Sequence, residues 1–149
     1  MHAAKDLMAP IEILLVEDSA GDVRLTREAL SDARVRNNLH VASNGLEAMD
    51  FLGRVGAFGA APRPDLILLD LNLPKMGGRE VLEQVKRSEQ WKTIPVVVLT
   101  TSAAEEDIDR SYQLHANCYI TKPVDLDQFL KVVKTIDNFW LAIVKLPRV

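Results

Sequence analysis

The chain has 149 residues, 18 Lys and Arg against 21 Asp and Glu, and a hydrophobic fraction of 48%. This size fits one domain, the formal charge of −3 gives no support to a nucleic-acid or anionic-membrane binder, and the single cysteine excludes an internal disulfide. No apolar stretch reaches about 18 residues and the first ten residues lack the apolar region of a secretory signal, so we expect a cytoplasmic protein without a membrane span.

Short aliphatic runs alternate with helical patterns along the chain. In chain order the sequence predicts a strand over 11–16, a helix over 21–33, a weak strand over 39–42, a helix over 43–52, a strand ending at Asp70, a helix over 79–88, a strand over 95–99, a polar helix over 105–115, a strand over 118–121 and a helix over 126–144. Residues 53–64 form a long Gly/Ala/Pro-rich loop, which Phe58 is expected to anchor to the body.

Alternating strands and helices predict an α/β fold with a parallel sheet covered on both faces. The flavodoxin-like strand order 2-1-3-4-5 places the first and third strands side by side at the switch point of the sheet. Ligands bind such folds in the crevice at the carboxyl ends of the strands, so residues that end the strands are site candidates.

Acidic residues end the first and third predicted strands. Glu17 and Asp18 follow the first, and Asp70 ends the third. Asp70 alone would be an ordinary strand terminator, but neighbouring strands would bring three carboxylates together. Each pair would repel by about 4 kcal/mol at 4 Å, so the cluster needs a cation. Oxygen-only ligands favour Mg²⁺, with Ca²⁺ or Mn²⁺ as alternatives.

The two remaining strand ends carry a hydroxyl and an amine. Thr100 follows the fourth predicted strand and Lys122 the fifth. Taken singly, Thr100 is a strand-end residue whose hydroxyl forms hydrogen bonds with backbone groups. Lys122 is a solvated charge, and Tyr119 is a half-buried core residue. Trp91 and Trp140 are interpreted as packing residues. The convergence of the four strand ends, rather than any one residue, indicates a site.

These residues together resemble the receiver domain of two-component response regulators. The resemblance covers about Ile11 to Phe139 and rests on five elements in order, which are Glu17-Asp18, Asp70, Asn72-Leu73-Pro74 with Gly77-Gly78, Thr100, and Lys122-Pro123. It implies a protein that is not a turnover enzyme but a phosphoacceptor that assists its own phosphorylation and dephosphorylation.

The resemblance also implies a role for each residue. Asp70 is implied as the phosphoacceptor for a sensor histidine kinase, and Lys122 as the amine that pairs with a phosphoryl oxygen. Glu17 and Asp18 are implied to hold Mg²⁺ together with Asp70 and the backbone carbonyl of Asn72.

The implied switch residues are Thr100, which bonds the phosphoryl group, and Tyr119, which rotates into the space that Thr100 vacates. Pro123 is implied to follow a cis bond. Thr101 departs from the family pattern, where many members carry alanine to leave a path to the phosphate, so we expect access to the phosphate or the dephosphorylation rate to differ.

The expected organisation is a tail over residues 1–10, a receiver domain over 11–144 and a short tail over 145–149, with no output domain. The last predicted helix has more apolar positions than one buried stripe requires, which favours a homodimer. The predicted dimer face comprises Phe129, Val132, Ile136, Phe139, Trp140 and Ile143. Of these, Phe129, Ile136 and Trp140 are also candidates to face the sheet.

The stretch from Glu17 to Leu25, together with Leu99 to Ser102 and Phe139-Trp140, is most similar to stand-alone regulators that partner phytochrome histidine kinases. Three alternatives stay open. A phosphatase with an aspartyl-phosphate intermediate would carry an acid at position 72, where this chain has Asn72. A flavodoxin-like cofactor binder lacks its phosphate loop after the first strand. A dimeric adaptor with the receiver fold, independent of phosphorylation, would have kept the pocket for structure.

Overall fold

The computed structural model describes residues 10–31, 36–100, 118–122 and 124–133 of the chain. Within them, five parallel strands form one sheet in the order β2-β1-β3-β4-β5. The strands are β1 (Ile11–Val16), β2 (Asn37–Ala42), β3 (Leu66–Asp70), β4 (Val96–Thr100) and β5 (Cys118–Thr121). The predicted flavodoxin-like order is therefore confirmed.

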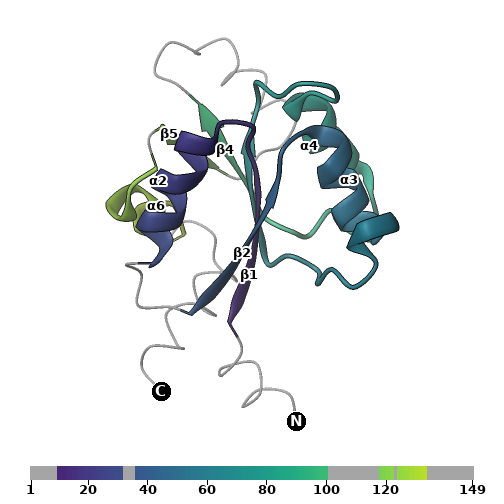
Figure 1. The fold of residues 1–149 in the computed structure, drawn as a ribbon, viewed down its shortest axis with the longest axis horizontal. Helices are drawn as coiled ribbons and strands as arrows, with labels where there is room; N and C mark the ends of the chain where they lie inside the picture. The colour runs from purple at the N-terminus through teal and green to yellow at the C-terminus, as the bar shows by residue number, and fades with distance from the viewer. Residues whose placement is uncertain (1–9, 32–35, 101–117, 123, 134–149) are drawn as a thin grey trace.

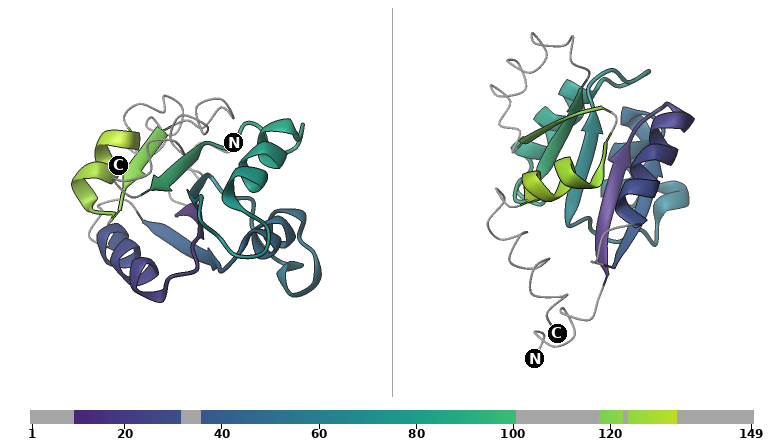
Figure 2. Two further views of the ribbon diagram at one scale, coloured as in Figure 1. Left: turned by 90° about the horizontal axis from the view of Figure 1, so that it is seen from above. Right: turned by 90° about the vertical axis from the view of Figure 1, so that its left-hand side faces the viewer.

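Helices cover both faces of the sheet. The helices are α2 (Ala20–Ser31), α3 (Gly45–Gly53), the 3-10 turn η1 (Gly56–Phe58), α4 (Gly78–Arg87) and α6 (Leu126–Val133). Helices α2 and α6 lie on one face, and α3 and α4 on the other (Figures 1 and 2). The predicted helix over 105–115 lies outside the described residues, as does the predicted continuation of the last helix beyond residue 133.

The alternation of side chains along β1 divides the core into two halves. Ile13 and Leu15 pack on the side of α2 and α6, whereas Leu14 and Val16 pack on the side of α3 and α4. All five residues of β3 are buried, as expected for the central strand of a parallel sheet with helices on both faces. The central strands are thus fixed in depth and register, and so are the polar residues at their carboxyl ends.

Strand β2 begins two residues earlier than the sequence predicts. Asn37 and Asn38 look like helix breakers, yet their backbones pair with Ile11 and Glu12 of β1. The Asn37 side chain donates to the carbonyl of Leu30 at 3.1 Å, and Asn38 donates to a carboxylate oxygen of Glu12 at 3.0 Å. These side-chain hydrogen bonds hold the two asparagines at the edge of the sheet, which propensity alone does not anticipate.

Two aromatic residues show how the outer segments are held. The Phe58 ring lies edge-on to Phe51, with centroids 5.7 Å apart, which confirms that Phe58 anchors the loop before β3. Phe129 of α6 is only 4% exposed and packs in the core with Ile120 and Val124. This corrects the assignment of Phe129 to the dimer face, because its ring already faces the sheet.

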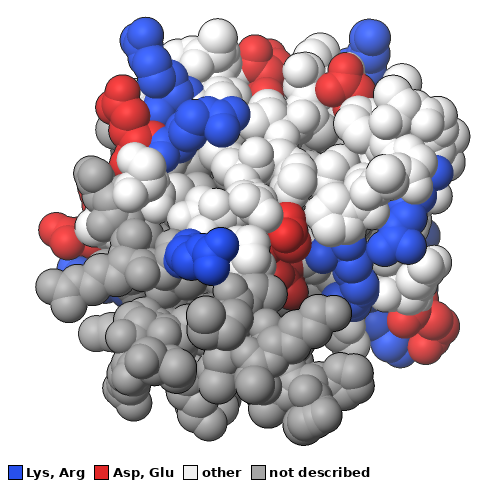
Figure 3. Space-filling model, turned by 60° about the horizontal axis from the view of Figure 1, so that its bottom comes forward, with Lys and Arg blue, Asp and Glu red and all other residues white. Residues whose placement is uncertain are grey.

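Charged side chains on the face where β1 begins are mixed in sign. Figure 3 shows Lys and Arg interspersed with Asp and Glu there, without a continuous basic area among the described residues. Among the residues that the structure describes, no helix has the length and apolar character needed to cross a membrane.

Candidate functional site

Three carboxylates meet at the carboxyl edge of the sheet. Glu17 and Asp18 follow β1, Asp70 ends β3, and these strands are direct neighbours. A carboxylate oxygen of each lies within 4.8 Å of one from each of the others. Counted over the whole residue, Glu17 and Asp70 are 2% and 4% exposed, whereas Asp18 faces solvent. The cluster therefore has a buried floor and an open side through which an ion can enter.

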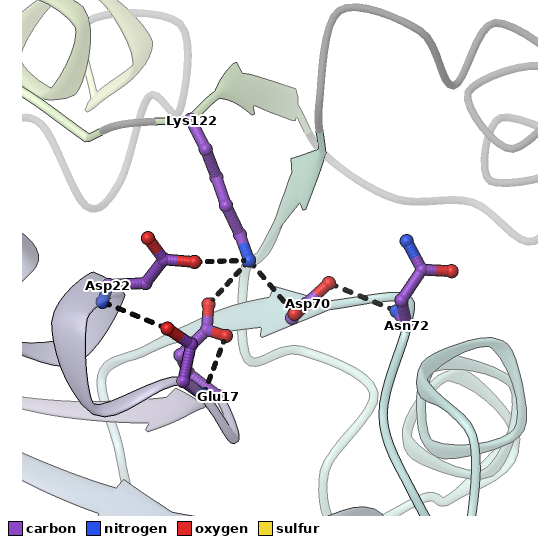
Figure 4. Close-up of polar contacts among 6 residues, drawn as sticks. Glu17, Asp22, Asp70, Asn72 and Lys122 are labelled. Carbon is purple, nitrogen blue, oxygen red and sulfur yellow. Dashed lines mark hydrogen bonds and ion pairs between the residues drawn. The ribbon is translucent and has the colours of Figure 1, made fainter.

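Lys122 supplies the positive charge of the cluster. Its ammonium nitrogen lies 2.8 Å from Glu17 Oε1, 2.9 Å from Asp70 Oδ2 and 3.1 Å from Asp22 Oδ2. Figure 4 shows the side chain reaching from the end of β5 to the end of β3. Asp70 is held on its other side as well, since its Oδ1 accepts the backbone N–H of Asn72 at 3.0 Å.

Asp22 is a further residue of the site, which was not predicted from the sequence. This residue lies in the first turn of α2, where its backbone N–H donates to Ser19 Oγ at 3.2 Å. The Ser19 hydroxyl thus caps the start of the helix, and the Ser19 backbone N–H donates to Glu17 Oε2 at 3.2 Å. The signal that was available is the spacing: the third residue after a helix cap returns toward the cap, and hence toward the acidic pair before it.

Burial and charge act in opposite directions on the ionisable groups. Burial raises the pKa of Glu17 to about 7; the Lys122 hydrogen bond opposes the rise and the nearby Asp70 charge adds to it. Burial alone would lower the pKa of Lys122, but hydrogen bonds to Glu17, Asp70 and Asp22 outweigh it, so this pKa is raised. Lys122 is therefore charged at neutral pH, while Glu17 is close to its midpoint.

We expect the metal-free protein to lose stability as the pH rises toward 7. A carboxyl whose pKa is 4.5 when unfolded and about 7 when folded contributes stability fully below pH 4.5, and this contribution is lost as the pH rises through 7. Urea unfolding in EDTA between pH 4.5 and 7.5 measures the trend.

The Glu17→Gln variant should lose this part of the pH dependence, because glutamine does not titrate. Glu80→Gln, at an exposed position of α4, serves as the control and should keep it. Equal slopes for the native protein and Glu17→Gln would contradict the assignment.

Two glycines hold the loop that follows Asp70. A Cβ on Gly78 would lie 2.6 Å from Leu71 Cα and closer still to the carbonyl oxygen of Asp70, and a Cβ on Gly45 would lie 2.7 Å from Met76 Cβ. The N-termini of α4 and α3 thus pack directly against this loop, without room for a Cβ atom. Asn72, whose carbonyl is an expected metal ligand, lies in the loop.

The structure describes the predicted switch residues only in part. Thr100 ends β4, where its backbone pairs with Thr121, but its side chain lies outside the description. Tyr119 is half-buried and packs against the core on the side of α3 and α4. Pro123 is not among the described residues. The roles of Thr100, Tyr119 and Pro123 as a switch stay predictions.

The donor set fits a hard divalent cation. All three clustered groups are carboxylates, and such oxygen donors are preferred by Mg²⁺, Mn²⁺ and Ca²⁺. Glu17 and Asp70 also contact Lys122, so an ion that binds the cluster shares these two carboxylates with the ammonium.

A parallel 2-1-3-4-5 sheet with three carboxylates and a lysine at its carboxyl edge defines a class of signalling domain. The chain belongs to the response regulator receiver domain family, which matches residues 13–134. The resemblance inferred from the motifs is therefore confirmed at the level of the family, whose members are signalling proteins.

Individual relatives narrow the comparison. Response regulator Rcp1 of Synechocystis sp. is 51% identical over 138 residues, which cover 93% of this chain and 94% of Rcp1. The crystal structure of the Mn²⁺-bound form of Rcp1 is 52% identical with a TM-score of 0.73, covering 89% of this chain and 95% of that one. The phosphorylated cyanobacterial phytochrome response regulator RcpA is 52% identical with a TM-score of 0.75 and the same coverage.

Proposed function

We propose that this response regulator accepts a phosphoryl group on Asp70 from a sensor histidine kinase and passes the signal on by binding other proteins. The observation that carries the proposal is the position of the Asp70 carboxylate, which ends the central strand beside the Lys122 ammonium and two further carboxylates. A nucleophile, a fixed cation and a set of metal ligands within one edge of the sheet are the parts that phosphoryl transfer requires.

Each residue then has a chemical task. An oxygen of Asp70 attacks phosphorus in line with the bond to the kinase histidine, the P–N bond breaks, and neutral imidazole leaves after protonation. Lys122 pairs with an equatorial phosphoryl oxygen and lowers the charge that develops there. Glu17, Asp18, Asp70 and the carbonyl of Asn72 would hold Mg²⁺, which would supply charge neutralisation at the phosphoryl oxygens.

We propose a kinase of the phytochrome type as the partner. The support is the similarity to RcpA, a phytochrome response regulator, over nearly the whole chain. A homodimer formed through the end of the last helix stays a prediction, because Ile136, Phe139, Trp140 and Ile143 and the Val132 side chain lie outside the described residues. Cytoplasmic localisation stays a prediction as well.

Transfer of label from a kinase tests the proposal. A phytochrome histidine kinase that has labelled itself with radioactive ATP is mixed with the regulator and Mg²⁺, and a chemotaxis histidine kinase serves as the control. We expect the label to move to the regulator within seconds from the first kinase and far more slowly from the second. Efficient transfer from the control alone would remove the phytochrome partner, and transfer from neither would favour the adaptor that works without phosphorylation.

A further inference from the structure

We propose that Asp22 is a positioning residue, which retains the Lys122 ammonium when a metal ion takes Glu17 and Asp70. The ammonium lies within ion-pair distance of three carboxylates, and those of Asp70 and Asp22 accept hydrogen bonds from it. Two of these carboxylates belong to the cluster that fits a metal, and Asp22 does not. The inference rests on the proposed metal site and assigns a task to a residue outside it.

Asp22 is placed for this task by the start of α2. Its backbone N–H is fixed on the Ser19 hydroxyl, which sets the direction of the first helical turn. Its side chain is 35% exposed, compared with 1% for Glu17 and 6% for Asp70. Asp22 therefore keeps contact with water that the two buried carboxylates lack.

The surroundings of Lys122 offer an acid outside the metal cluster. The hollow beside Lys122 is lined by Glu17, Asp22, Leu25, Thr26, Leu99 and Val124, and Asp22 is the carboxylate among them that does not belong to the cluster. When a divalent ion binds Glu17 and Asp70, it also repels the ammonium at short range. With Asp22 present, Lys122 turns toward that carboxylate and stays beside Asp70, where the phosphoryl group arrives.

Removing Asp22 should therefore weaken metal binding through Lys122. Without Asp22, the ammonium has only Glu17 and Asp70 as partners among the three, and the ion competes with it at both carboxylates. A rival explanation is that Asp22 attracts the ion by its charge alone. The two differ in one respect, because the rival effect persists when Lys122 is removed and the positioning effect does not.

A double-mutant cycle on Mg²⁺ binding separates them. The Kd for Mg²⁺ is measured by titration calorimetry on the full chain for the native protein, Asp22→Asn, Lys122→Met and the double variant. We expect Asp22→Asn to raise the Kd about fivefold in the native background and less than about twofold in the Lys122→Met background, which is typical coupling for charged neighbours. Asp22→Glu, which keeps the carboxylate, should stay within about twofold of the native Kd.

Each other outcome is decisive. A rise of the same size in both backgrounds, or no rise in either, would overturn the role of Asp22 and leave the metal site intact. Absence of Mg²⁺ binding by the native protein would overturn the metal site and this proposal with it. Asp18→Asn checks that the measured heat belongs to the site, since it removes a proposed ligand without touching Lys122. Thermal unfolding of every variant confirms that each is folded.

Discussion

Replacement of Asp70 by asparagine is expected to abolish phosphorylation completely. Asparagine fills nearly the same volume and its side-chain oxygen can still accept the N–H of Asn72, but a neutral amide is a poor nucleophile toward phosphorus. Intact-protein mass after incubation with Mg²⁺ and a small acyl phosphate measures the result. The native chain should gain the mass of one phosphoryl group, and Asp70→Asn should gain none.

The residue just before the same strand offers a matched control. Asp65 precedes β3 at the opposite end of the sheet, where its carboxylate accepts the backbone N–H of Glu12 at 2.8 Å. Asp65→Asn makes the same chemical change far from the site and should be phosphorylated like the native chain. A full adduct on Asp70→Asn would show that another residue is the acceptor, and loss of the adduct in both variants would point to damage to the sheet instead.

The second large effect is expected at Gly78. Alanine there would place its Cβ against the backbone of Asp70 and Leu71, which no side-chain rotation relieves. Overpacking costs about 3 kcal/mol, and the better helix propensity of alanine returns about 1 kcal/mol, so the free energy of unfolding should fall by about 2 kcal/mol. Denaturant unfolding measures this change. Phosphorylation should also slow, because the loop that carries Asn72 must move away from α4.

The adjacent glycine provides the control. A Cβ on Gly77 meets nothing within 4 Å, so Gly77→Ala changes only the cap of α4 and should cost less than about 1 kcal/mol. If the two alanine variants lose equal stability, the close approach of α4 to the loop is not what requires glycine at position 78. A stable Gly78→Ala with normal phosphorylation would contradict the prediction outright.

The sequence was most informative about the sheet and the ends of its strands. The aliphatic runs before Glu17 and Asp70 identify two buried parallel strands, and the topology of alternating strands and helices brings their ends together without knowledge of any contact. The clustering of the acids was therefore predictable. The ion pairs of Lys122 with Glu17 and Asp22 were not, because the direction of a long flexible side chain depends on all of its neighbours at once.

The sequence was less informative where side-chain contacts decide where a strand begins or which side of a helix is buried. Asn37 and Asn38 extend β2 because their side chains find acceptors in Leu30 and Glu12, which belong to other elements. Phe129 lies in an apolar helix whose buried side cannot be separated from an exposed one by pattern alone, and the packing against Ile120 settled its orientation. Asp22 was overlooked because a single acid in a first helical turn is an ordinary feature of helices.

The distance along the chain between Lys122 and its partners has a consequence for how the protein is made. Lys122 lies 52 residues after Asp70 and 100 residues after Asp22. During synthesis the acidic residues of β1, α2 and β3 therefore leave the ribosome well before the lysine that neutralises them. Until β5 docks beside β4, the carboxylates at the ends of β1 and β3 lack the Lys122 ammonium, and a cation from the surrounding solution can act as their counter-charge.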